Sequence, residues 1–462
     1  MDLAAQQRWT QDFLDTMRQA ADPAADQVVA DVYARDAVNG VNRLLMNAVC
    51  PAATLPAELQ DIVHRFLTET AVLPSWADET LIERCETFFS EHGLLSSAIL
   101  CCASLPECYL DAYDAPVLAS TTQLVKHVNR RVLQTAHMVV STMQPGGMRP
   151  NGPGLIAAQR VRLMHAAVRH LLTRQAAKAS TEGAPAYWDG AHGKPINQES
   201  MAFVILTFSY VGIRAIETLG LIDLDDPEDH ALEMREAYVH TWSVIGHVMG
   251  VREDLLARSY DDAKFLFETI KQRRRGASAA GQELTHALMQ WMEDSLPLPL
   301  KSLPRELTVQ LIGEEDAALL GVTLDQHQHA TQHFWEKAVH VVADIADKLD
   351  EHPFLGKAAM TMFHFLTNTL FRQNQQWTDG AFALPVALQE AWTPPSERQQ
   401  NLDKLGGHES LLAGIEADSP GTLLKSMADK LHIPGLHGSQ SAKPAAQVAS
   451  HAAGLAADSP GF

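Results

Sequence analysis

Hydrophobic side chains recur along this chain mostly at helical spacing, three or four residues apart. The clearest example is the stretch 160–172, in which Val161, Met164, Val168 and Leu172 form one apolar stripe. Such spacing predicts amphipathic helices. Alternating strand patterns are scarce, and no internal repeat is evident. The pattern therefore predicts an all-α, multi-helix protein.

Breaks rich in proline and glycine divide this helical pattern. Residues 57–143 are expected to form four helices, and the turn-rich loop 144–154 separates the last of them from the helix at 160–172. Asn197 is a typical first residue for an apolar helix that ends near Gly220. Further helices are expected at 228–250, 252–274, 278–295, 304–312, 325–350 and 356–376.

The same breaks predict three parts. Residues 1–56 are expected to form acidic N-terminal helices that pack on the core, and residues 57–392 the main helical domain. From about residue 393, serine, glycine, proline, alanine and charged residues dominate. Residues 393–462 are therefore predicted to be a low-complexity, mostly disordered tail.

Composition supports helices and limits the possible partners. The 462 residues are 46% hydrophobic but only 6% aromatic, and their alanine, leucine and valine favour an α-helical core. The net charge of −20 argues against binding to nucleic acid or to anionic lipid. We expect no membrane-spanning helix, because no apolar run is long enough. Without a leader pattern or a disulfide framework among its five cysteines, the chain is expected to be cytoplasmic with reduced thiols.

His165 is the first candidate for a functional residue. Helical spacing places it with Val161 and Val168 on the apolar face of its helix, and Arg162 and Arg169 lie about one turn to either side. A neutral imidazole in such surroundings can ligate haem iron, and the two arginines could pair with the propionates. The alternative is a core histidine that is hydrogen-bonded to a carbonyl group.

A second candidate face lies on the preceding helix, about thirty residues earlier. Arg131 and Thr135 are four residues apart, so they share one helical face, which Met138 and Thr142 continue. Burying an arginine and a threonine among apolar residues is unfavourable unless they meet a ligand. This face is therefore predicted to line a binding site.

Together the two helices resemble the latex-clearing, or rubber oxygenase, family of b-type haem proteins, which also includes an oxygenase of mycophenolic acid biosynthesis. The family pattern is Arg-x-x-x-Thr, then about thirty residues, then Arg-x-x-His-Ala-x-x-Arg. The matching residues here are Arg131, Thr135, Arg162, His165, Ala166 and Arg169. The runs 193–210 and 244–251 are also similar, and the resemblance covers roughly residues 35–300, and more weakly to about 390.

This resemblance implies an all-helical fold around a globin-like core, with haem b as the cofactor of the main helical domain. It implies that His165 is the proximal iron ligand and that Arg162 and Arg169 lie beside the haem. Arg131 and Thr135 would be the catalytic residues, which orient dioxygen, order water or pair with a propionate. The implied reaction is dioxygen-dependent attack on an alkene or a similar apolar substrate.

Two positions depart from the rubber-cleaving members. Those members carry a lysine next to the threonine that can ligate iron from the distal side, and the residue here is Gln134. They also carry a glutamate base sixteen residues before the arginine, where this chain has Ala115, with Asp114 and Asp111 close by. Polyisoprene is therefore a poor substrate candidate. A small hydrophobic, alkene-type substrate inside the cell is expected instead.

Other constellations are weaker candidates. His240 and His247 share a helical face and are the second choice for a haem-facing histidine. Glu283 and His286 form a single E-x-x-H, whereas a di-iron site needs two. The histidine-rich run 325–333 lacks the ligands that would complete a metal site. Two other functions stay open: a haem-binding sensor without turnover, and a helical interaction protein without haem.

Overall fold

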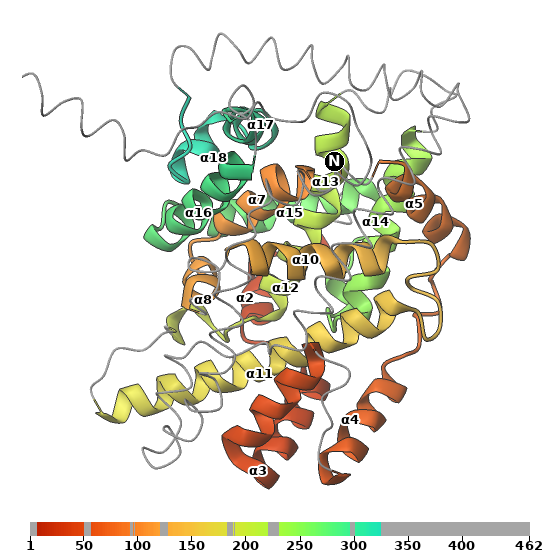
Figure 1. The fold of residues 1–462 in the computed structure, drawn as a ribbon, viewed down its shortest axis with the longest axis vertical. Coiled ribbons are helices and arrows are strands. Elements are labelled where there is room, and N and C mark those ends of the chain that lie inside the picture. The colour runs from red at the N-terminus through yellow and green to blue at the C-terminus, as the bar shows by residue number, and fades with distance from the viewer. Residues whose placement is uncertain are drawn as a thin grey trace, which may run out of the picture. The chain divides into compact units, whose positions relative to one another are not determined.

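The computed structural model describes most of the chain up to residue 324 (Figure 1). The described residues are 7–49, 57–92, 96, 98–120, 128–182, 188, 190–219, 231–295 and 301–324. These residues contain helices and turns but no strand, apart from an isolated antiparallel bridge between Asp111 and Arg275. The all-α class predicted from the sequence is confirmed, whereas a globin-like core stays a prediction.

The α-helices follow one another in chain order, with one π-helix, η1 (Leu100–Ser104), and the 3-10 turns η2 (Gly190–His192) and η4 (Glu253–Leu255) between them. They are α2 (Gln11–Arg18), α3 (Pro23–Val49), α4 (Ala57–Glu69), α5 (Glu79–Glu91), α7 (Leu105–Tyr109), α8 (Ala115–Ser120), α10 (Val128–Met143), α11 (Pro153–Glu182), α12 (Gln198–Phe208), α13 (Tyr210–Thr218), α14 (Ala231–Val248), α15 (Tyr260–Arg274), α16 (Ala279–Ser295), α17 (Leu303–Ile312) and α18 (Glu314–Leu319).

Local sequence explains most of these bounds. Four of the helices predicted after residue 220 fall in the described part of the chain. Three of them, α14, α16 and α17, have bounds within a few residues of the prediction. Helix α15 begins later than expected, because Ser259 caps it by accepting a hydrogen bond from the backbone of Asp262. The helices predicted at 325–350 and 356–376, and the tail 393–462, lie outside the described residues.

Helices α12 and α13 form the centre of the larger hydrophobic core. Asn197 caps α12 as predicted, accepting a hydrogen bond from the backbone of Ser200. Within the described part, Gln198–Thr218 is the one segment that is apolar and long enough to cross a membrane, but 78% of its apolar window is buried inside the molecule. A helix that is apolar on all sides and covered by protein is a core helix.

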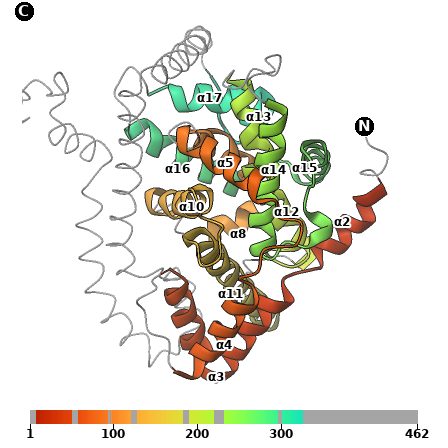
Figure 2. The same ribbon diagram turned by 90° about the vertical axis from the view of Figure 1, so that its right-hand side faces the viewer.

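Helix α11 lies between α10 on one side and α3 and α4 on the other (Figures 1 and 2). A second hydrophobic cluster fills the space between α3, α4 and α11. Its buried members are Ala25, Val28, Val29, Val32, Val41, Leu44, Leu59, Ile62, Val63, Phe66, Leu163, Met164, Ala166, Ala167 and Leu171.

Candidate functional site

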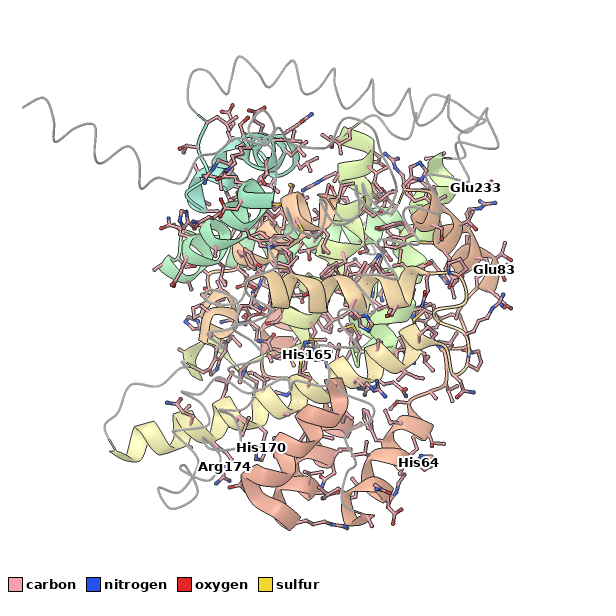
Figure 3. The ribbon with its side chains drawn as sticks, viewed as in Figure 1. His64, Glu83, His165, His170, Arg174 and Glu233 are labelled. Carbon is pink, nitrogen blue, oxygen red and sulfur yellow. The ribbon has the colours of Figure 1, made fainter. Side chains whose placement is uncertain are left out.

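His165 lies near the middle of α11, on the side towards α10, whereas His170 and Arg174 lie on the side towards α3 (Figure 3). Contacts with Tyr33 of α3 agree with this placement. The ring centroids of Tyr33 and His170 are 4.9 Å apart. The guanidinium carbon of Arg174 lies 4.3 Å from the centroid of the Tyr33 ring. His165 therefore faces away from this part of α3.

The stripe of α11 that contains His165 is only partly covered by protein. Val161, His165 and Val168 are half-buried, whereas Ala166 and Ala167, on the side of α3 and α4, are fully buried. Apolar side chains that stay partly uncovered in the middle of a long helix leave apolar surface beside the imidazole. This is the surface on which a flat apolar group could lie.

Helix α10 packs against α11 and carries the other predicted site residues. Thr135 is half-buried, and Met138 and Thr142, which share its face, are buried. The hydroxyl of Thr142 donates to the carbonyl oxygens of Met138 and Val139, at 3.0 and 2.9 Å, so its burial needs no ligand. The side chains of Arg131 and Gln134 lie outside the described part of α10.

His137 shows how closely the two helices approach. The pKa of His137 lies below its usual value, first because the ring is largely buried and second because Arg160 of α11 is near. Burial and a nearby cation both disfavour the imidazolium. A neutral imidazole of α10 therefore lies close to α11, a placement that the sequence did not predict.

Arg162 contacts a carboxylate of the protein itself. Its Nε and Nη2 donate to the Oδ2 and Oδ1 of Asp22, at 2.6 and 2.9 Å, and its Nη1 donates to the carbonyl oxygen of Val248 at 3.3 Å. The side chains of Arg162 and Asp22 are only 13% and 9% exposed. Asp22 directly precedes Pro23, the first residue of α3, so this bidentate pair joins α11 to the start of α3.

Arg169 makes a second pair with the same region. Its Nε donates to the Oδ1 of Asp26 in the first turn of α3, at 2.8 Å, and its Nη2 lies 2.7 Å from the same oxygen. Its Nη1 donates to the carbonyl oxygen of Ile196 at 2.7 Å. Ile196 has a φ of +51°, which a β-branched residue rarely adopts and which costs about 1–3 kcal/mol. The surroundings of Arg169 hold this strained backbone in place.

Gln198 and Gly250 complete the junction around Arg162. The buried amide of Gln198 donates to the carbonyl oxygens of Ala21 and Gly250, both at 2.9 Å, and accepts from the backbone of Arg252 at 2.9 Å. Gly250 has a φ of +87°, and a Cβ on it would lie 2.4 Å from the Oδ2 of Asp22. We call Asp22, Asp26, Arg162, Arg169, Gln198 and Gly250 the polar junction.

The second-choice histidines lie elsewhere and have protein partners. The Nε2 of His240 accepts a hydrogen bond from the backbone of Asp78 at 2.8 Å, and the Nδ1 of His247 lies 2.5 Å from the Oε1 of Glu253. Both rings contact Trp76 edge-on, with centroids 5.6 and 6.2 Å from that of Trp76. These contacts favour a structural role for His240 and His247.

The acidic residues near Ala115 bind an arginine. Asp111 and Asp114 contact Arg274 at 2.6 and 2.8 Å, and Arg274 also lies 3.2 Å from Glu199. Burial, with Asp114 close by, raises the pKa of Asp111 to about 7 even though Arg274 lowers it. Ala115 itself is fully buried. The two aspartates thus belong to a buried ion cluster with Arg274, and this placement does not favour either as a base.

Two other kinds of site can be tested on the described residues. In that part of the chain, no three His, Cys, Asp or Glu side chains are grouped so that they could hold a metal ion. The run 325–333 lies outside it. A surface pocket of about 410 Å³ adjoins Arg162, but its walls carry charges of both signs, from Glu69, Arg162, Arg252 and Glu253. Such walls do not suit an apolar substrate.

Comparison with known proteins identifies the family. The model of the catalytic domain described as "ER-bound oxygenase mpaB/B'/Rubber oxygenase" matches residues 92–343, more than half of the chain. The chain belongs to this family of oxygenases. A rubber oxygenase of Streptomyces sp. (strain K30) is 25% identical over 275 residues, which are 58% of this chain and 62% of that protein. The chain thus matches less than two thirds of the length of this relative.

A solved structure shows the same fold. The latex clearing protein LCP in its closed state superposes with a TM-score of 0.58 at 22% identity, over 71% of this chain and 84% of that one. The family match begins at residue 92, so Asp22 and Asp26 of the polar junction precede it. Neither aspartate was singled out in the sequence. The only local signal was the order Asp22-Pro23, which is typical of a helix start.

The residues of this family member fit a haem b by their chemistry. A b-type haem needs an imidazole donor and apolar walls on both faces. His165 offers the donor within a half-covered apolar stripe, and half-buried Thr135 and Ala136 lie on the neighbouring α10. Arg162 and Arg169 already contact carboxylates of the protein, so their role towards propionates stays a prediction.

Proposed function

We propose that this protein is a haem b-dependent oxygenase and that His165 is the proximal ligand of the iron. The observation that carries the proposal is the position of His165: it stands on the half-covered apolar stripe of α11, turned towards α10, inside the family's catalytic domain. When bound, the haem iron supplies the centre at which dioxygen is activated.

The chain's own residues would have separate tasks at this site. The imidazole of His165 binds the iron and must be neutral to do so. Thr135 and Arg131 of α10 would orient dioxygen or an ordered water, since a hydroxyl and a guanidinium are hydrogen-bond donors in an otherwise apolar pocket. Apolar side chains lining such a pocket would exclude bulk water, which would strengthen these polar contacts.

We propose a small hydrophobic, alkene-type molecule as the substrate, together with dioxygen. The support is indirect: Gln134 and Ala115 stand where rubber-cleaving members have a lysine and a glutamate. We also propose a cytoplasmic location, in keeping with the four free, buried cysteines of the described residues, Cys85, Cys101, Cys102 and Cys108.

The decisive experiment is the absorption spectrum of protein purified from a haem-sufficient host. The wild type should show a Soret band and b-type haem, at about one haem per chain. His165→Ala should lose the haem, whereas the matched control His247→Ala should retain it. A normal spectrum for His165→Ala would overturn the ligand assignment, and loss of haem in His247→Ala would transfer the role to that residue.

Turnover needs a separate measurement. Ferrous protein should consume dioxygen in the presence of an apolar alkene drawn from a panel of small compounds. A haem-containing protein that consumes no dioxygen with any of them would instead be a haem-binding sensor. A protein without haem would be a helical interaction protein.

A further inference from the structure

We propose that Asp22 and Asp26 are positioning residues for His165: their ion pairs with Arg162 and Arg169 fix the rotation and the axial position of α11. The proposal rests on the proposed function, because it concerns the histidine that would ligate the iron. Both aspartates lie before residues 92–343, the segment that matches the family's catalytic domain.

The two pairs bracket the histidine. Arg162 precedes His165 by three residues and Arg169 follows it by four, so one clamp lies about a turn to each side of the imidazole. Both arginines bind the start of the same helix, α3: Arg162 binds Asp22, which directly precedes the helix, and Arg169 binds Asp26 in its first turn. Two fixed points along one helix prevent it from sliding and from rotating about its axis.

Apolar packing alone would fix the rotation and the axial position of α11 less accurately. Much of the interface between α3 and α11 consists of small or short side chains, such as Ala25, Val29, Ala166 and Ala167. Such a smooth surface tolerates small shifts, whereas a bidentate arginine–carboxylate pair has a fixed distance and plane. The position of the imidazole must be accurate to a fraction of an ångström for iron ligation.

The energetics of the pairs favour a positioning role over a purely stabilising one. A buried ion pair adds little net stability, because desolvation of both charges offsets most of their attraction. The start of α3 reduces this penalty, since the positive end of a helix dipole favours a carboxylate there. Asp22 also accepts a hydrogen bond from the backbone of Ala25, at 3.4 Å.

The surrounding backbone is adapted to these pairs. Gly250 leaves room for Arg162 and Asp22, and Ile196 adopts a strained φ of +51° at the point where its carbonyl oxygen meets Arg169. Gln198 ties Ala21 to Gly250 beside the first pair. Strain that is retained at one place, and compensated by specific contacts, is typical of a position with a functional constraint.

The test compares haem-loaded wild type with Asp22→Asn, Asp26→Asn and the double variant. Asparagine keeps the shape and removes the charge. The readouts are the iron–histidine stretching band of the ferrous protein, by resonance Raman, and the rate of haem transfer to an acceptor apoprotein. We expect a shifted or broadened band and at least about tenfold faster haem loss in the double variant.

Asp316→Asn is the matched control. Asp316 is, like Asp22, a buried carboxylate. It is bound to Lys271 at 2.7 Å and to Arg275 at 2.5 Å, but none of these residues belongs to α11. Asp316→Asn should lose about as much stability as the variants of Asp22 and Asp26. It should leave the iron–histidine band and the haem transfer rate unchanged. The same spectral change in Asp316→Asn at an equal melting temperature would overturn the proposal.

Two further variants, Asp26→Glu and His165→Ala, complete the test. Asp26→Glu should restore the wild-type band, because the side chain of Asp26 is 34% exposed and leaves room for one methylene group. If the double variant fails to fold, the comparison of Asp26→Glu with Asp26→Asn still tests the proposal. A double variant with the wild-type band and haem transfer rate overturns the positioning role but leaves the proposed function intact. A normal spectrum for His165→Ala overturns the proposed function itself.

Discussion

Gly250 lies directly against Arg162: a Cβ added to the glycine would be 2.5 Å from the Nε of the arginine. The two residues are far apart in sequence, since Arg162 lies in α11 and Gly250 in the turn that follows α14, and the contact exists because the glycine has no side chain. Its φ of +87° is also unfavourable for any residue with a side chain.

Gly250→Ala should therefore reduce the free energy of unfolding by about 2–4 kcal/mol, since it combines backbone strain with a steric clash. Gly190→Ala is the control, because an added Cβ there meets nothing within 4 Å. Denaturant unfolding of both variants checks this. Equal stability of the two variants would mean that the junction around Arg162 adjusts without strain.

Thr135→Ala and Arg131→Ala should reduce dioxygen-dependent turnover more than haem content. Neither residue is on the ligand helix, so iron ligation should survive, while a polar contact of about 1–3 kcal/mol near the bound oxygen is lost. Thr218→Ala is the control, because its exposed hydroxyl donates to a carbonyl oxygen of its own helix, that of Arg214, at 2.8 Å. Wild-type turnover in Thr135→Ala and Arg131→Ala would make both residues structural.

The ferric resting protein should not be ligated by lysine and should bind imidazole readily. The reason is Gln134, whose amide is a very weak iron ligand. Gln134→Lys should weaken imidazole binding, because an amine then competes for the iron. Absorption titration measures both. A six-coordinate low-spin spectrum without added ligand would contradict the prediction and point to His137, whose lowered pKa keeps it neutral.

The contribution of Asp111 to the stability of the protein should fall as the pH rises from about 4 to about 7. Burial raises the pKa of Asp111 from 3.8 to about 7, against the effect of Arg274. In this window the folded state binds more protons than the unfolded state, so the stability linked to the protonated carboxyl is lost as it ionises.

The asparagine in Asp111→Asn cannot titrate, so the variant should lack this part of the pH dependence of the unfolding free energy. The difference in unfolding free energy, wild type minus Asp111→Asn, should decrease with rising pH by up to about 1.4 kcal/mol per pH unit. Denaturant unfolding at several pH values measures it. A difference that grows with pH would show that Arg274 keeps the carboxylate ionised throughout.

What the sequence determined is local. Helix formation depends on residues three or four positions apart, so the all-α class, the start of α12 at Asn197 and the helix that carries His165 could be predicted. The family could also be predicted, because its motif lies on two helices at a fixed spacing. For the same reason the motif positions of Arg162 and Arg169 were visible, but the groups that they bind were not.

What only the tertiary structure decided is which distant groups meet. Asp22 is 140 residues from Arg162, and Gln198 lies 54 residues from the backbone amide of Arg252 that it accepts from. No periodicity encodes such pairs, because a side-chain contact depends on how whole helices pack. Sequence reasoning offered haem propionates as partners for both arginines. Packing brings the start of α3 to them, since buried guanidinium groups require partners and Asp22 and Asp26 supply carboxylates there.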